Sequence, residues 1–396
     1  MKKNLIFVID SLDVAGAEKS LVTLLSMIDY SKFSVDLMLF GHGGELEEFV
    51  PKEVHVLPPL KYIKFSKLNI KEAIVYSLKK LDFNWLRSRA KYSISIRMKK
   101  YSDPQKARIF WQSVSQAIES NYKTYDIAIS YAQGVPTFYV AEKVKAMKKI
   151  AWVNTSFRLE NKDREFQKKF YDQYNQIVAV SDSSKEIFIE TFPEYTDKMR
   201  VIYDINNSEL ILKMADIGES FDDQFDGIRI LTIGRLNREK GYDMALAACR
   251  KLKDTGIKFK WYVLGKGPQK EEIEKFIKEY GLSDYFILLG VKSNPYPYIK
   301  HSDIYVQTSR YEGFGLAIAE ARMLNVPVIT TKFDAVFNQM IDGRNGLVVD
   351  MNGDAVYDGI MMMINNKSLR ETIINYLRVE KKGNVEELDK FYQLIG

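Results

Sequence analysis

Short apolar runs alternate with amphipathic segments along the whole chain. In the first half, apolar runs of strand length occupy residues 4–9, 35–40, 127–130, 149–153 and 176–181. In the second half they recur at 228–233, 258–264, 287–291, 303–307 and 327–331. Segments with apolar residues at helical spacing separate these runs. Nearly continuous apolar runs are typical of parallel strands buried on both faces, so the alternation predicts an α/β fold.

An acidic stretch separates the two series of strands and helices. Residues 208–226 contain six Asp or Glu and show no strong apolar period after Met214. We therefore expect two Rossmann-like, doubly wound domains facing a cleft, over residues 1–207 and 227–384, with 208–226 as the linker. Ligands of such sheets bind beyond the carboxyl ends of the strands, where the glycine turns of this chain fall.

One glycine turn, residues 311–315, leads into a helix expected at 316–324. Its glycines would let a ligand approach the backbone, and the N–H groups that open the helix would attract an anion such as a phosphate. Glu312 lies in the turn and Glu320 in the helix. Carboxylates accept hydrogen bonds from the hydroxyls of a ribose or a sugar. The alternative is an ordinary turn with two surface glutamates.

A second glycine turn, residues 234–241, follows the strand at 228–233 and carries cations. Arg235 offers a planar fork of donors and Lys240 a point charge, and together they suit a diphosphate. The alternative is a basic surface loop.

Both turns resemble motifs of one enzyme family. Glu312 and Glu320, with seven residues including Gly-Phe-Gly between them, resemble the signature of retaining GT-B glycosyltransferases of the family 4 type. Residues 234–241 are similar to the family's Gly-Arg-Leu-x-x-x-Lys-Gly motif, and residues 16–18 to its Gly-Gly-Ala-Glu loop, with Ala15 in place of the first glycine. The resemblance covers about 160 residues of the C-terminal half and only the ends of the N-terminal half.

The resemblance implies a retaining, metal-independent glycosyltransferase that needs no cofactor and uses a nucleotide diphosphate sugar, expected to be UDP-linked. Arg235 and Lys240 would stabilise charge on the leaving diphosphate. Glu320 would hold the ribose hydroxyls.

The resemblance also assigns the donor sugar to a short segment. Glu312, with the backbone of Phe314, Gly315 and Leu316, would position that sugar.

Further roles implied by the resemblance fall outside these turns. The backbone at Val291 would lie beside the base, and Gly16 would meet the diphosphate. Asn154 stands on the acceptor side where relatives often have a histidine, and an amide cannot act as a base. A C-terminal helix within 385–396 is expected to pack back onto the first domain.

Composition narrows the chemistry and the location. The single Cys249 excludes an intramolecular disulfide framework, and the chain has three histidines and no Asp-x-Asp pair. No metal site is therefore expected. No apolar run approaches the length of about 18 residues needed to span a membrane. The expected location is cytoplasmic, or peripheral at the inner face of the membrane.

Charge is concentrated in residues 61–108, which hold 14 Lys and Arg against 3 Asp and Glu, a net charge of +11, with aromatic residues interleaved. This composition favours an anionic membrane surface or an acidic acceptor. A glycan, a polyanionic polymer of teichoic-acid or capsular type, and a lipid-linked saccharide are the candidate acceptors. Nucleic acid is not expected, because no recognised binding motif accompanies the charge. The alternative is a solvated helix face.

Other functional classes remain open from the sequence. A nucleotide-sugar epimerase of the same fold would need acid or base groups on both sides of the sugar. A phosphorylase of the same fold would need a lysine that binds pyridoxal phosphate. A non-catalytic partner subunit would be expected to have lost Arg235, Lys240 or one of the two glutamates, and all four are present. The sequence leaves open the sugar, the acceptor, the linkage, the pathway and the oligomeric state.

Overall fold

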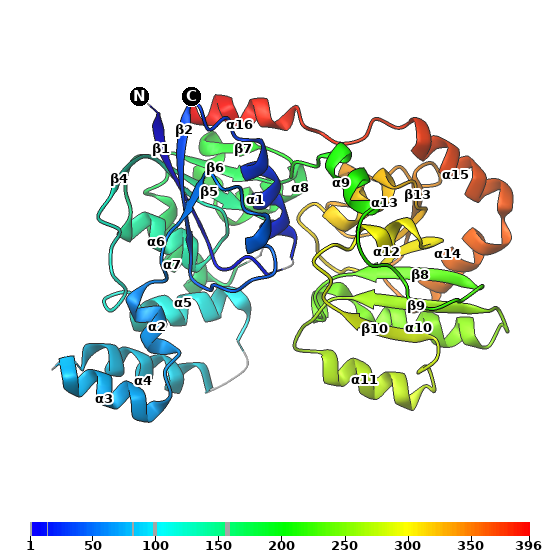
Figure 1. Ribbon diagram of the computed structural model, residues 1–396, viewed down its shortest axis with the longest axis horizontal. Coiled ribbons are helices and arrows are strands. Elements are labelled where there is room, and N and C mark those ends of the chain that lie inside the picture. Colours follow the sequence, from blue (N-terminus) through cyan, green and yellow to red (C-terminus); the bar gives the residue numbers. More distant parts are fainter. Residues whose placement is uncertain (1, 14, 81–82, 98–100, 155–158) are drawn as a thin grey trace. The chain divides into compact units, whose positions relative to one another are not determined.

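The chain forms two α/β units, which are described one at a time (Figure 1). A computed structural model describes residues 2–13, 15–80, 83–97, 101–154 and 159–396. Unit 1 holds most of the chain before residue 203 together with the last six residues, and unit 2 contains Tyr203–Lys390.

Unit 1 is built on a seven-stranded parallel sheet in the order β3-β2-β1-β4-β5-β6-β7. Its strands are β1 (Lys3–Ile9), β2 (Phe33–Leu39), β3 (Val54–Val56), β4 (Thr124–Ser130), β5 (Lys145–Val153), β6 (Gln176–Ala179) and β7 (Met199–Val201). Its helices are α1 (Gly16–Met27), α2 (Lys61–Ser66), α3 (Ile70–Lys80), α4 (Asn84–Arg97), α5 (Asp103–Val114), α6 (Val135–Lys143), α7 (Asn161–Tyr171) and α8 (Asp182–Thr191), with 3-10 turns η1 (Glu47–Phe49) and η2 (Pro193–Lys198).

Unit 2 is built on a six-stranded parallel sheet in the order β10-β9-β8-β11-β12-β13. Its strands are β8 (Ile228–Ile233), β9 (Phe259–Leu264), β10 (Phe286–Gly290), β11 (Ile304–Gln307), β12 (Val328–Thr331) and β13 (Gly346–Val349). Its helices are α9 (Ser208–Ala215), α10 (Tyr242–Lys253), α11 (Lys270–Glu279), α12 (Tyr296–Lys300), α13 (Leu316–Met323), α14 (Gly353–Asn365) and α15 (Lys367–Val379), with 3-10 turns η3 (Arg238–Lys240) and η4 (Val336–Asn338).

Burial of both sheet faces explains the apolar runs in the sequence. Every residue of β1 from Leu5 to Ile9 is fully buried. In unit 2, one cluster joins the sheet to α10 and α14, and another joins it to α9, α12 and α13. The predicted α/β fold with two Rossmann-like domains is confirmed by the two parallel sheets, and in unit 2 the strands contribute side chains to both of these clusters.

The stretch expected as a linker contains ordered structure of unit 2. Asn207 caps α9 by accepting a hydrogen bond from Leu210 N at 3.1 Å. The buried Ile211 and Ala215 lie four residues apart on one face and join the cluster beneath α12 and α13. The apolar spacing of α9 covers too few residues to predict a helix from the sequence, because acidic residues follow it directly.

The last helix, α16 (Glu387–Ile395), begins in unit 2 and ends in unit 1. Phe391 is fully buried, with its ring centroid 6.3 Å from that of Phe7 and 6.4 Å from that of Trp152. Lys3 Nζ donates to the carbonyl of Ile395 at 3.2 Å. The end of the chain thus fills part of the core of unit 1.

Within the described residues, none of the helices combines the length and the apolar character that a transmembrane segment requires.

Candidate active site

The candidate site lies at the carboxyl ends of β8 and β11, which are neighbours in the sheet of unit 2. The chain order of the strands reverses between these two, and ligands of doubly wound folds bind outside the sheet at this point. Two loops leave it, residues 234–241 after β8 and residues 308–315 after β11. The topology therefore brings together the two glycine turns that the sequence singled out.

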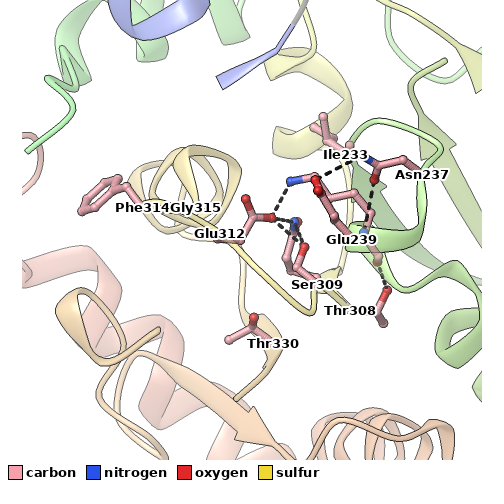
Figure 2. A network of polar contacts seen from close by, with 12 residues as sticks. Ile233, Asn237, Glu239, Thr308, Ser309, Glu312, Phe314, Gly315 and Thr330 are labelled. Carbon is pink, nitrogen blue, oxygen red and sulfur yellow. Dashed lines mark hydrogen bonds and ion pairs between the residues drawn. The ribbon is translucent and has the colours of Figure 1, made fainter. Parts of the chain in front are cut away.

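A single carboxylate oxygen joins the two loops (Figure 2). Oε1 of Glu312 accepts hydrogen bonds from Lys240 Nζ, from Gln307 Nε2 at 2.6 Å and from Ser309 Oγ at 2.6 Å. The side chains of Lys240 and Glu312 are only 20% and 12% exposed. Partial burial strengthens the attraction between the two charges, because less water screens it.

The backbone of Lys240 is fixed from both loops. Asn237 caps η3 by accepting a hydrogen bond from Lys240 N at 3.3 Å, and Thr308 Oγ1 donates to the carbonyl of Lys240 at 2.8 Å. Gly241 has φ +64°, and a Cβ there would lie 2.1 Å from the carbonyl oxygen of Thr308. Only glycine allows this close approach of the two loops.

A second ion pair ties the loops together farther from the strand ends. Arg310 donates to both carboxylate oxygens of Asp243 at 2.8 and 2.7 Å, and its backbone N–H donates to the carbonyl of Glu239 at 2.7 Å. The hydrogen bonds from Arg310 lower the pKa of Asp243. Arg235, by contrast, is exposed and has no ion-pair partner among the described residues, so its guanidinium is available to a ligand.

The start of α13 has the geometry of an anion site. Gly315 is in the left-handed region at φ +84°, and the first intrahelical hydrogen bond runs from Ile318 N to the carbonyl of Gly315 at 2.9 Å. The amides of Leu316 and Ala317 precede that bond and belong to the helix's unpaired N-terminal donors. Such donors, together with the helix dipole, favour negative charge.

Gln339 holds this turn from behind, and the sequence did not predict that role. Its side-chain amide donates to the carbonyl of Phe314 and, at 3.1 Å, to the carbonyl of Gly315. Arg322 donates to Gln339 Oε1 at 3.3 Å and pairs with Glu380, whose side chain is 13% exposed. No motif marks Gln339, because its function depends on the loop before β13 folding against α13.

Glu320 is 3% exposed on α13, and Tyr296 Oη donates to its Oε1 at 3.1 Å. Burial raises the pKa of Tyr296 well above its ordinary value, and the Glu320 carboxylate adds to the rise. The tyrosine therefore stays protonated and remains a donor at neutral pH. The carboxylate of Glu320, which we expect to bind a ribose, is thus oriented by a hydrogen bond from the buried side of the helix.

The other predicted positions occupy the ends of strands or the start of a helix. Val291 follows β10 and is half-buried, and Gly16 is the first residue of α1. Asn154 follows β5, and its Nδ2 donates to the carbonyl of Tyr131 at 2.6 Å. The described residues contain no group of three or more His, Cys, Asp or Glu side chains placed to hold a metal ion.

Sequence comparison identifies the family of unit 2. Residues 220–380 match the model of the family described as glycosyl transferases group 1. The chain therefore contains a domain of this glycosyltransferase family, and the resemblance inferred from the two turns is confirmed.

Curated relatives match the chain over about half its length. A Campylobacter jejuni enzyme, N-acetylgalactosamine-N,N'-diacetylbacillosaminyl-diphospho-undecaprenol 4-alpha-N-acetylgalactosaminyltransferase, is 26% identical over 54% of this chain and 57% of its own. The capsular polysaccharide biosynthesis glycosyltransferase CapM of Staphylococcus aureus is 28% identical over 54% of this chain and 60% of its own. The matched region thus spans a little over half of each relative.

Solved structures resemble the whole chain. A Rickettsia africae glycosyltransferase has a TM-score of 0.67 and 17% identity, covering 100% of this chain and 98% of its own. Anabaena HepE, solved in complex with UDP and glucose, has a TM-score of 0.68 and 16% identity, and the match covers 99% of this chain and 98% of HepE. The likeness shows that the chain has a GT-B-like fold.

We expect Glu312→Ala to lower the free energy of unfolding by about 1–3 kcal/mol, because three donors lose their common acceptor. Arg235→Ala in the same site should change it by less than about 0.5 kcal/mol, because that side chain is exposed. Urea unfolding of the two variants beside the parent protein measures both values. Equal stability of all three proteins would contradict the structural role of Glu312.

Proposed function

We propose that the protein is a retaining, metal-independent glycosyltransferase that moves a sugar from a UDP-sugar to an envelope-type glycan, polymer or lipid-linked acceptor. The observation that carries this proposal is the pairing of Lys240 with Glu312 where β8 and β11 end, with the exposed Arg235 in the same turn as Lys240. One place then holds cations suited to a diphosphate and a carboxylate suited to sugar hydroxyls.

The charges define the proposed division of labour. Arg235 and Lys240 neutralise the departing diphosphate, which is the task of a metal ion in other transferases. An ammonium has three N–H donors, so Lys240 can bind Glu312 and still donate to a phosphate oxygen. The amides at Leu316 and Ala317 add donors to the same anion.

The proposed transfer keeps the sugar's configuration. The bond between the anomeric carbon and the diphosphate oxygen breaks, and the acceptor oxygen bonds to the same face of the carbon. The departing phosphate oxygen takes the acceptor's proton, so the step needs no separate base. Asn154, whose amide cannot accept a proton at neutral pH, is consistent with this route on the acceptor side.

The relatives support the proposed substrates. The Campylobacter enzyme is named for a diphospho-undecaprenol acceptor and CapM for capsular polysaccharide, while HepE was solved with UDP and with UDP-glucose. On that basis we propose that this protein also uses a UDP-sugar donor and a lipid-linked or polymeric acceptor.

Slow hydrolysis of the donor tests the proposal without the natural acceptor. The purified protein is incubated with a panel of nucleotide sugars, and mass spectrometry follows the release of nucleotide and free sugar. We expect one UDP-sugar to be hydrolysed above background, at the same rate in excess EDTA. A rate lost in EDTA and restored by manganese or magnesium would reject the cation-based mechanism. Conversion of the UDP-sugar to its epimer would instead identify an epimerase.

Arg235→Ala and Lys240→Ala should each lower turnover by about a hundredfold or more, since fixed charge at a leaving group contributes about 3 kcal/mol. Arg238→Ala removes an exposed cation from the same turn and serves as the control. Normal turnover in either of the first two variants would reject the diphosphate assignment.

Glu320→Ala should weaken UDP binding by about 1.5–3 kcal/mol, because the ribose is present in substrate and product alike. Glu312→Gln should reduce turnover more than UDP affinity. Isothermal titration calorimetry with UDP separates the two, and equal affinities in both variants and the parent would contradict the assignment.

Gln339→Glu should weaken UDP binding by about 1–3 kcal/mol, because a carboxylate would face two carbonyl oxygens and the α13 amides would lose their orientation. Phe337→Ala, at a side chain that is 57% exposed, is the matched control in the same loop. Calorimetry checks the prediction. Unchanged UDP affinity in Gln339→Glu would show that the turn holds its shape without this amide.

A further inference from the structure

Four apolar side chains on the outer side of α3 are exposed to solvent. Ile70, Ile74, Val75 and Leu78 are 72%, 41%, 48% and 54% exposed. Their spacing places all four on one side of an α-helix. We call these four side chains the α3 face. Exposed apolar side chains that gather on one face mark an interaction site more often than single ones do.

The α3 face is not the core side of the helix. Ala73 and Ser77 point inward and are fully buried. Tyr76 stacks on Trp85 of α4, with centroids 5.8 Å apart and an angle of 9° between the rings. Asn69 and Glu72 form a reciprocal capping pair at the start of α3, with hydrogen bonds of 2.9 and 3.1 Å. The helix is therefore anchored on one side while its other side is left uncovered by the described chain.

Positive charge lies around the α3 face and, at Lys71, within it. In Figure 1, α3 and α4 lie side by side at the margin of unit 1, beyond α2 and α5. Residues 70–97 hold seven Lys and Arg against two Asp and Glu. Lys71, Lys79 and Lys80 on α3 are exposed, and so is Ile94 on α4, at 67%. Lysine side chains can lay their stems along an apolar surface and keep the ammonium in a polar layer.

We infer that the α3 face docks unit 1 on an anionic lipid bilayer. An apolar helix side flanked by lysines is the arrangement of helices that lie in a membrane interface, with the apolar side chains among the acyl chains and the cations at the headgroups. A second copy of this chain fits the face less well, because a self-complementary contact would bring the same lysines near one another. The inference does not depend on the transfer reaction, since its residues lie outside the candidate site.

Vesicle co-sedimentation tests this inference. The full chain is mixed with phosphatidylcholine vesicles containing about 30% phosphatidylglycerol, or none, at low salt and again at about 0.5 M salt. We expect binding to the anionic vesicles at low salt only. Ile74→Ser/Leu78→Ser should lower the partition coefficient at least about tenfold, because the apolar contact is lost. Lys79→Gln/Lys80→Gln should lower it severalfold.

Matched variants separate the α3 face from general effects. Met147→Ser changes a side chain of unit 1 that is 78% exposed on β5, and Lys275→Gln/Lys278→Gln removes two exposed charges from α11. Both should bind vesicles as the parent does. Ile70→Asp is a second test of the face that favours folding, because an acidic residue suits the first turn of a helix. Circular dichroism confirms that each variant is folded.

Three outcomes would overturn the inference. In the first, the parent protein does not bind anionic vesicles at low salt. In the second, Ile74→Ser/Leu78→Ser and Ile70→Asp both bind these vesicles as the parent does. In the third outcome, sedimentation without lipid shows a dimer that Ile74→Ser/Leu78→Ser dissociates, which would assign the face to a second copy. UDP binding by calorimetry should be the same in all these variants, so failure of docking is distinguishable from failure of the proposed transferase.

Discussion

The arrangement of unit 2 depends on the hydrogen bonds and opposite charge that the Glu312 carboxylate receives. Glu312 lies mostly out of water, and a charge in that position is costly unless opposite charge and hydrogen bonds compensate it. Lys240, Gln307 and Ser309 supply that compensation at one oxygen. Lys240 lies in the loop after β8, whereas Gln307 ends β11 and Ser309 follows it, so the compensation holds only while these two adjacent strands are correctly paired. The same contact that stabilises the unit therefore fixes the position of the Lys240 ammonium.

Behind this pair, a second polar chain shapes the turn before α13. Gln339 accepts a hydrogen bond from Arg322 at its side-chain oxygen, and its side-chain nitrogen donates to the carbonyls of Phe314 and Gly315. Glu380 holds Arg322 and also accepts a hydrogen bond from Asn345 at 3.1 Å. A turn of positive φ is thus supported by side chains on three later segments. An anion site built on backbone amides needs this kind of support, because amides cannot adjust by rotating a side chain.

Local pattern was enough to predict the two sheets. Parallel strands covered on both faces must be mostly apolar, and the runs at 4–9 and 228–233 met that requirement. The pairing of Lys240 with Glu312 could not be read in this way, because 72 positions separate them and only the adjacency of β8 and β11 brings them together. Gln339 carries no motif, and α9 is only eight residues long and runs directly into the acidic residues that follow it. The roles of Gly16, Val291 and Asn154 stay predictions.

The path of the last helix has a consequence for synthesis on the ribosome. Phe391 completes the packing around Phe7 and Trp152, residues that are translated long before it. Domains generally fold as units while the chain grows, the N-terminal one first. Here the N-terminal unit lacks one of its buried aromatic side chains until the entire C-terminal unit has been translated. A fragment that ends near residue 202 would leave the apolar surface beside Phe7 uncovered, and such surface promotes aggregation during folding.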